Sequence, residues 1–292
     1  MDWRQFVMNL ESLHPTRVEE VLARHGVVAV TLSDAGDNPV LEPAPGETPL
    51  WADTRITGLF PGDANLELLE EDILQSFGLE QLPDHHIEEL EDCIWEREWL
   101  KNFRPMKFGR RLWVSPHDYA GEFSDDVVIR LDPGLAFGTG THPTTALCLE
   151  WLDSLDLKHK DVMDFGCGSG ILAIGALLLG AKSATAMDID PQAITATRSN
   201  ATANRVSAQL VTTLNVMDCQ HAFDVVVANI LAEPLVELAP TLSASVASNG
   251  VLALSGILEE QIDAVSAAYE PWLEIQAPVV RDGWVLLKGT RR

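Results

Sequence analysis

A glycine-rich segment, DFGCGSG at residues 164–170, is the part of the chain whose residue types and spacing most plainly allow chemistry. It follows an apolar run typical of a strand and precedes an apolar stretch typical of a helix. Glycines at such a junction let the backbone approach a ligand closely, and the start of a helix supplies N–H donors. A turn without a ligand is the weaker alternative, because three glycines alternate here. We therefore predict a cofactor-binding loop.

Two cofactors compete for this loop. The spacing from Gly168 to Ala173 matches the G-x-G-x-x-A form of the nicotinamide dinucleotide fingerprint. Asp164 argues against that match, because a carboxylate at the strand end is a poor neighbour for a pyrophosphate and suits a cationic amino-acid group. The pattern D-x-G-x-G-x-G is typical of enzymes that use S-adenosylmethionine, which carries an ammonium group, a sulfonium and no phosphate. We predict S-adenosylmethionine as the cofactor.

Polar residues that follow other predicted strands complete the candidate site. Asp188 lies 22 residues beyond Gly166, where a carboxylate can accept hydrogen bonds from both hydroxyls of a ribose in either cofactor. Asp190 is better explained as the N-cap of a helix that begins at Pro191. Asn229 follows an apolar strand, and its side-chain carbonyl can accept an N–H from an amine and aim the nitrogen lone pair at a methyl group. An asparagine that only caps a turn is the alternative.

The segment at residues 131–145, LDPGLAFGTGTHPTT, is dense in glycine and threonine and precedes an apolar helix at residues 146–155. Such a loop offers hydroxyl and amide groups to a ligand. His142 within it is a candidate general base, but a single histidine beside a proline is more often structural. The sequence leaves a catalytic part for His142 open.

The elements that must position these residues alternate regularly between strand and helix from residue 161 onward. Predicted strands lie at residues 162–165, 184–189, 209–214, 225–230, 251–255, 274–280 and 284–288. Predicted helices lie at residues 170–179, 191–203, 234–246 and 259–269. Apolar strands separated by helices imply a mainly parallel sheet covered on both faces, and the turn at residues 281–283 predicts a closing antiparallel hairpin. This is the seven-stranded arrangement of Rossmann-like class I methyltransferases.

Residues 1–91 predict a separate, smaller α+β domain. Their strand-like and helix-like segments follow the order β-α-β-β-α-β, which is the ferredoxin-like arrangement. These segments lie at residues 3–10, 16–25, 27–32, 51–60, 63–77 and 84–91. A charged helical stretch at residues 92–104 predicts a connector. Strands at residues 110–115 and 127–131 then introduce the methyltransferase domain, residues 105–292.

The charge of the chain limits its partners. It has 44 acidic and 20 basic residues, a formal net charge of −24, and such a surface would repel a phosphate backbone. Residues 1–100 hold 22 of the acids and only 5 of the bases, so an electrostatic partner of this part should be basic. Acids that only keep the protein soluble are the alternative. We expect no direct contact with nucleic acid.

The sequence also indicates a compartment. Its four cysteines form no C-x-x-C pair, which argues against a structural zinc site and a disulfide scaffold. The first residues lack the basic start and apolar run of a signal peptide, and no stretch of 18 apolar residues occurs. We expect a cytoplasmic protein without a membrane span.

Four stretches together resemble a known family. FGTGTHPTT, DFGCGSGILAIGA, MDIDPQA and DVVVANILAEPL are similar to the bacterial ribosomal protein L11 methyltransferase family, PrmA. The glycine motif is shared by a whole superfamily, whereas the first and last stretches are much more specific. The resemblance covers nearly the whole chain, including the acidic first domain and the connector.

The resemblance implies S-adenosylmethionine-dependent methylation of a large-subunit ribosomal protein, L11, on its N-terminal α-amine and on lysine ε-amines, up to the trimethyl state. The first domain would hold this protein, the connector would let it present different amines to one catalytic site, and we expect a monomer. Asn229 would be the catalytic residue. Carried over by position, the cofactor-binding residues would be Thr144, Thr145, Gly166, Gly168, Asp188 and Asn229.

The chemistry would be an in-line displacement of the methyl group by a neutral amine. Deprotonating a free lysine costs roughly 4.6 kcal/mol at pH 7. Burial beside a sulfonium lowers this cost, so no strong base is required. Three alternatives remain: methylation of another protein or a small-molecule amine, a nicotinamide-dependent oxidoreductase, and a non-catalytic adaptor.

Overall fold

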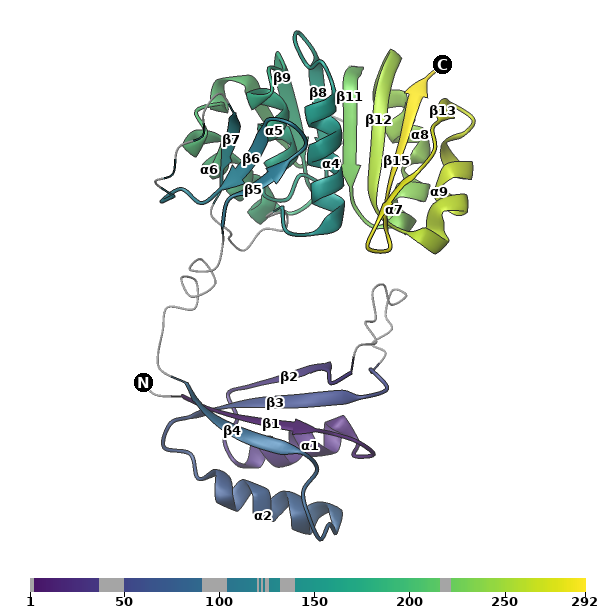
Figure 1. Ribbon diagram of the computed structural model, residues 1–292. Helices are drawn as coiled ribbons and strands as arrows, with labels where there is room; N and C mark the ends of the chain where they lie inside the picture. Colours follow the sequence, from purple (N-terminus) through teal and green to yellow (C-terminus); the bar gives the residue numbers. More distant parts are fainter. Residues whose placement is uncertain are drawn as a thin grey trace. The chain divides into compact units, whose positions relative to one another are not determined.

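The computed structural model describes most of the chain: residues 3–36, 50–90, 104–119, 121, 123, 126–131, 140–215 and 222–292. The chain divides into two compact units, Met1–Trp95 and Glu96–Arg292 (Figure 1). Residues 92–103 of the predicted connector and residues 132–139 of the predicted glycine- and threonine-rich loop lie outside the described residues. No helix in the described ranges is long and apolar enough to cross a membrane.

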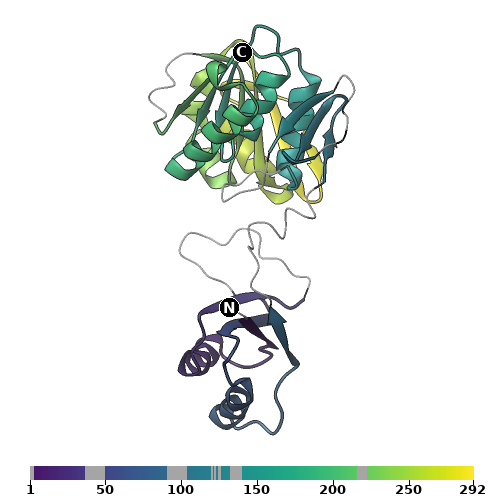
Figure 2. The ribbon, with the colours of Figure 1, turned by 90° about the vertical axis from the view of Figure 1, so that its left-hand side faces the viewer.

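The first unit has the predicted order of elements, β-α-β-β-α-β. They are β1 (Trp3–Asn9), α1 (Pro15–Arg24), β2 (Ala29–Asp34), β3 (Thr54–Pro61), α2 (Leu66–Phe77) and β4 (His85–Leu90). The strands form an antiparallel sheet in the order β2-β3-β1-β4. Both helices cover one face of this sheet (Figure 1 and Figure 2).

The core of the first unit lies between its sheet and its helices, because alternate residues of each strand point to the same face. Phe6 and Met8 of β1 and Ile56 and Phe60 of β3 point to the helix side and are fully buried. They pack against the buried stripes of α1 and α2, which recur at helical spacing. One face of the sheet is thus apolar, as expected for an antiparallel sheet covered on one side.

The second unit contains a mixed sheet in the order β10-β9-β8-β11-β12-β15-β13, with β14 also paired to β15. The first five strands in this order run parallel, and β15 is antiparallel to its neighbours. The bounds are β8 (Asp161–Phe165), β9 (Ser183–Met187), β10 (Leu210–Thr213), β11 (Phe223–Asn229), β12 (Val246–Leu258), β13 (Leu273–Ile275), β14 (Val279–Arg281) and β15 (Trp284–Arg291).

The sheet differs from the sequence prediction in its number of strands. The single strand predicted at residues 274–280 is two short strands, β13 and β14, which both pair with β15 in different registers. Among the described residues the sheet therefore has eight strands, but β13 and β14 lie along the same edge of β15, so only seven strand positions lie across it. The predicted closing hairpin is present: Arg281 pairs with Trp284, and Asp282 and Gly283 between them both have positive φ.

Helices cover both faces of this sheet (Figure 1). They are α4 (Pro143–Ser154), α5 (Ile171–Leu178), α6 (Pro191–Ala203), α7 (Ala232–Glu237), α8 (Ala239–Ser245) and α9 (Ile262–Tyr269). The sequence predicted one helix at residues 234–246, and this is wrong: two helices, α7 and α8, lie there. Pro240 lies in the first turn of α8, and a proline cannot donate the backbone hydrogen bond that would continue α7.

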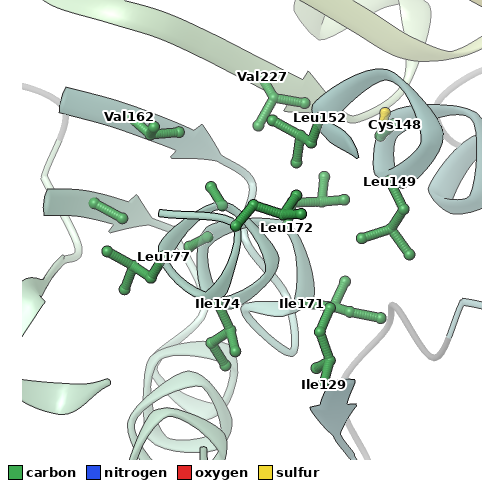
Figure 3. Packing of buried hydrophobic residues seen from close by; sticks show 14 of the residues in the cluster. Ile129, Cys148, Leu149, Leu152, Val162, Ile171, Leu172, Ile174, Leu177 and Val227 are labelled. Carbon is green, nitrogen blue, oxygen red and sulfur yellow. The ribbon is translucent and has the colours of Figure 1, made fainter. Parts of the chain in front are cut away.

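The strand residues alternate between two separate cores. Val162 of β8 and Val227 of β11 pack with α4, α5 and α6, as Figure 3 shows around the buried leucine and isoleucine side chains of α5. Met163 and Val226, their neighbours in sequence, pack with α7, α8 and α9 on the other face. Because both faces are buried, the interior positions of these strands are mostly apolar.

A small sheet adds a third layer to the α4–α6 side. It consists of β5 (Met106–Phe108), β6 (Leu112–Ser115) and β7 (Val127–Arg130), in that order, and the sequence predicted only the last two. Ile129 reaches the same core as α5 (Figure 3). The side-chain amide of Asn204, just after α6, pairs with both backbone groups of Arg130: Nδ2 donates to its O at 2.7 Å, and Oδ1 accepts from its N at 2.7 Å.

We predict that Asn204→Ala lowers the free energy of unfolding by about 2 kcal/mol, because two partly buried backbone groups of Arg130 lose their partner. Urea unfolding followed by circular dichroism measures this. Thr202→Ala is the control, since Thr202 is exposed and its hydroxyl bonds only within the end of α6 and to the nearby Ser207; its effect should stay within about 0.5 kcal/mol. Equal effects of the two substitutions would contradict the role of Asn204.

Candidate functional site

The register of the parallel sheet brings three of the predicted site residues together. Asp164 of β8 lies opposite Ala186 of β9 and Val227 of β11. Gly166, Asp188 and Asn229 each lie two residues beyond one of these three, in the same order. Since side chains alternate between faces, these positions lie on the face covered by α4, α5 and α6, at the carboxyl ends of the strands. Ligands of open α/β sheets bind at such ends.

A pocket of about 520 Å³ lies at this edge of the sheet. Five predicted site residues line it: Thr145, Gly166, Gly168, Asp188 and Asn229. Thr144, the sixth, is not one of its lining residues. Thr144 is buried, and its hydroxyl is hydrogen-bonded to Nδ1 of His142 at 2.7 Å.

Most of the remaining pocket wall is apolar, and the sequence did not predict it. The side chains come from the residues that flank the motifs: Phe165, Ile171, Leu172, Met187, Ile189, Ile230, Leu231, Pro234 and Leu238. Most of them lie within two residues of the glycines, the aspartate or the asparagine, whereas Pro234 and Leu238 lie in and just after α7 and had no such signal in the sequence. Ile189 and Leu231 remain largely exposed at the protein surface.

Asp188 is oriented by two backbone groups. Its Oδ2 accepts the N–H of Gly168 at 2.9 Å, and its Oδ1 accepts the N–H of Asp190 at 3.0 Å. A carboxylate oxygen has two lone pairs, so each oxygen can accept one further hydrogen bond from a pair of hydroxyls. Asp190 is the predicted N-cap of α6, and its Oδ1 accepts the N–H of Gln192 at 2.8 Å.

The glycine loop turns between β8 and α5 with a backbone that requires glycine. Gly166, Gly168 and Gly170 all have positive φ, at 74°, 52° and 78°. A Cβ on Gly166 would also overlap Cγ2 of Ile230. The loop is fixed to β9 because the N–H groups of Gly166 and Cys167 both donate to the carbonyl of Met187, at 2.8 and 3.0 Å.

Asp164 is placed differently from the sequence expectation. Its carboxylate was expected beside a cationic ligand group, but the side chain is fully buried behind the loop. Oδ2 accepts the N–H of Ala173 in the first turn of α5 at 3.0 Å, and Oδ1 has no hydrogen-bond partner among the described residues. Burial raises the pKa of Asp164 to about 7, and the negative charge of the nearby Asp188 acts in the same direction. A helix start that already binds a carboxylate is a poor site for a pyrophosphate.

Asn229 is connected to the first turn of α4. Its Nδ2 donates to Oγ1 of Thr145 at 3.4 Å, which leaves its Oδ1 as an acceptor. His142 is the N-cap of α4, since its Nδ1 accepts the N–H of Thr144 at 3.4 Å. Its ring also packs edge-on against Trp284, with 4.7 Å between the ring centroids. Burial lowers the pKa of His142, which favours the neutral form that a cap requires. The histidine therefore has a structural role here.

Comparison with known proteins gives one consistent result. A family model described as "Ribosomal protein L11 methyltransferase (PrmA)" matches residues 2–292. Proteins named "Ribosomal protein L11 methyltransferase" from Methylococcus capsulatus and Pseudomonas putida are 49% identical over 291 residues and 51% identical over 294 residues. These alignments cover 99% of this chain and 99% of the first relative, and 100% of this chain and 100% of the second.

A solved structure is also similar. The crystal structure of a ribosomal protein L11 methylase from Lactobacillus delbrueckii subsp. bulgaricus matches with a TM-score of 0.60 and 36% sequence identity. The match covers 65% of this chain and 100% of that chain.

The buried Asp164 predicts a pH dependence of stability. Its pKa of about 7 in the folded state lies above the usual value of about 3.9 in an unfolded chain. Between these values the folded state keeps a proton that the unfolded state has released. The contribution of Asp164 to stability is therefore fully present below pH ~4 and is lost as the pH rises to 7.

We predict that the unfolding free energy of the wild type falls relative to that of Asp164→Asn between pH 4 and 7, by up to about 4 kcal/mol. Urea unfolding at a series of pH values measures this difference. Asp263→Asn, at an exposed position of α9, is the control and should follow the wild-type curve. Parallel curves for wild type and Asp164→Asn would show that Asp164 is already charged at pH 4.

The loop geometry predicts the effect of a methyl group at Gly166. Gly283→Ala is a matched reference, because Gly283 has φ +77°, close to the +74° of Gly166, and no atom lies within 4 Å of the position that a Cβ would take there. Gly283→Ala should lower the unfolding free energy by about 1 kcal/mol through backbone strain alone. Gly166→Ala should cost clearly more, because its Cβ meets Ile230. Ile230→Leu removes Cγ2 and should recover part of the loss in the double variant; no recovery would contradict the overlap.

Proposed function

Because this chain belongs to the ribosomal protein L11 methyltransferase family, we propose that it transfers methyl groups from S-adenosylmethionine to amino groups of ribosomal protein L11. The observation that carries this proposal is the full-length match at about half identity to proteins of that name. The proposal is supported by the pocket, which Asp188, Gly166 and Asn229 line together.

The residues of the pocket fit S-adenosylmethionine. A volume of about 520 Å³ lies within the range of roughly 300–1,000 Å³ that suits a ligand of this size. Asp188 would hold the two ribose hydroxyls, because each of its oxygens can accept one more hydrogen bond. Gly166 and Gly168 would let the backbone approach the amino-acid part closely. When bound, the cofactor supplies a methyl group activated by a sulfonium.

Asn229 is the proposed catalytic residue. Its Nδ2 is engaged by Thr145, so its Oδ1 would accept an N–H of the substrate amine and direct the nitrogen lone pair toward the methyl group. Positioning of this kind supplies about 7–11 kcal/mol of a reaction barrier at best. The apolar wall around Asn229 disfavours an ammonium ion, and it therefore lowers the pKa of a lysine that enters the pocket.

We further propose that residues 1–91 form an acidic, ferredoxin-like domain that binds the ribosomal protein. Residues 92–104 would connect it to the catalytic domain, residues 105–292, in a cytoplasmic monomer. Acidic side chains such as Glu88 and Glu89 on β4 are exposed and would attract a basic protein. The amines modified would be the N-terminal α-amine and lysine ε-amines, up to the trimethyl state.

The function is tested by incubating the full chain with ribosomal protein L11 and methyl-labelled S-adenosylmethionine, followed by mass spectrometry of the protein. We predict labelled methyl groups on L11. Asn229→Ala should lower the turnover rate by about 100-fold, because the amine is no longer held in line with the methyl group.

Asn249→Gly is the control for loss of an asparagine. Asn249 has φ +61°, a conformation that glycine adopts easily, and it is not one of the residues lining the pocket. Its turnover should equal that of the wild type. Absence of label on L11 would overturn the substrate, and near wild-type turnover of Asn229→Ala would overturn the role of Asn229.

A further inference from the structure

Two side chains of α6 hold the backbone carbonyls of the glycine loop. Oγ1 of Thr197 donates to the carbonyl of Gly168 at 3.0 Å, and Nδ2 of Asn200 donates to the carbonyl of Ser169 at 2.8 Å. Thr197 is fully buried. The two residues are three positions apart, so they lie on the same side of the helix and face the loop together.

Thr197 contacts the loop at further points. Cys167 Sγ lies 3.4 Å from Oγ1 of Thr197, and a Cβ on Gly170 would lie 2.7 Å from Cγ2 of Thr197. The N–H of Gly168 in turn donates to Oδ2 of Asp188, which directly follows β9. The peptide groups at Gly168 are therefore fixed from two elements, α6 and the end of β9.

These anchors matter because the loop has little rigidity of its own. Three glycines within five residues have access to many conformations, and fixing them in one conformation costs conformational entropy. A ligand that had to order the loop on binding would bind more weakly by that amount. Neither Thr197 nor Asn200 lines the pocket, yet both fix Gly168 and Ser169 beside it.

We propose that Thr197 and Asn200 are positioning residues that hold the glycine loop in its cofactor-binding conformation before the cofactor binds. The expected effect on cofactor affinity rests on the proposed function, whereas the expected effect on the loop itself does not. The two effects therefore need separate measurements on the same variants.

The first measurement is amide hydrogen exchange of the loop in the full-length, ligand-free protein, read by mass spectrometry on peptides that contain Gly168 and Gly170. Thr197→Val is nearly isosteric and lacks the hydroxyl, so exchange of these amides should become about tenfold faster. Thr197→Ser keeps the hydroxyl and should restore slow exchange. Asn200→Ala should accelerate exchange independently, in case Thr197→Val does not fold.

Thr195→Val is the matched control on the same helix. Thr195 is exposed, and its hydroxyl donates within α6 to the carbonyl of Pro191 at 2.9 Å. It should leave exchange of the loop unchanged. The second measurement is calorimetric titration with S-adenosylhomocysteine: Thr197→Val should raise its Kd about tenfold, and Thr197→Ser and Thr195→Val should not.

The outcomes separate the two claims. Unchanged loop exchange in both Thr197→Val and Asn200→Ala would overturn the positioning role, even if the wild type binds S-adenosylhomocysteine tightly. Faster loop exchange with an unchanged Kd would overturn the claim that this order serves cofactor binding. Failure of the wild type to bind S-adenosylhomocysteine would overturn the proposed function, and the exchange result would still decide whether α6 orders the loop.

Discussion

A parallel sheet that is buried on both faces can carry functional polar groups only where its strands end. In this protein the interior positions of β8, β9 and β11 supply two apolar cores, one on each face. Polar residues then gather at the carboxyl ends of these strands, where the shared register aligns Asp188, Gly166 and Asn229 in one row. Asp164 lies one row deeper, and its pKa is raised because burial removes its carboxyl group from water.

The site divides into two parts that are held by different elements. The glycine loop is anchored by β9 through the carbonyl of Met187, by the carboxylate of Asp188, and by α6. Asn229 is instead connected to α4 through Thr145. The part proposed to bind the cofactor is thus held by β9, Asp188 and α6, while the residue proposed to orient the amine depends on how the first turn of α4 is placed.

The sequence predicted the parts of the structure that depend on local pattern. Gly166, Asp188 and Asn229 could be placed because each lies at or directly after the end of a largely apolar strand, and the N-cap Asp190 because it precedes a proline. The division of one expected strand into β13 and β14 could not be predicted, since both are defined by pairing with β15. The burial of Asp164 and Thr144 and the contacts of α6 with the loop were also missed. These depend on side chains that meet only after the helices pack on the sheet.

The most direct test of the proposed cofactor site is a crystal structure of the full-length protein with S-adenosylhomocysteine. We predict that the ribose hydroxyls lie about 3 Å from both carboxylate oxygens of Asp188. We also predict that the sulfur lies on the side of Asn229, and that the backbone of residues 166–170 keeps its present conformation. A ligand bound elsewhere, or a ribose that does not contact Asp188, would contradict the claim that the row of residues at the strand ends forms the cofactor site.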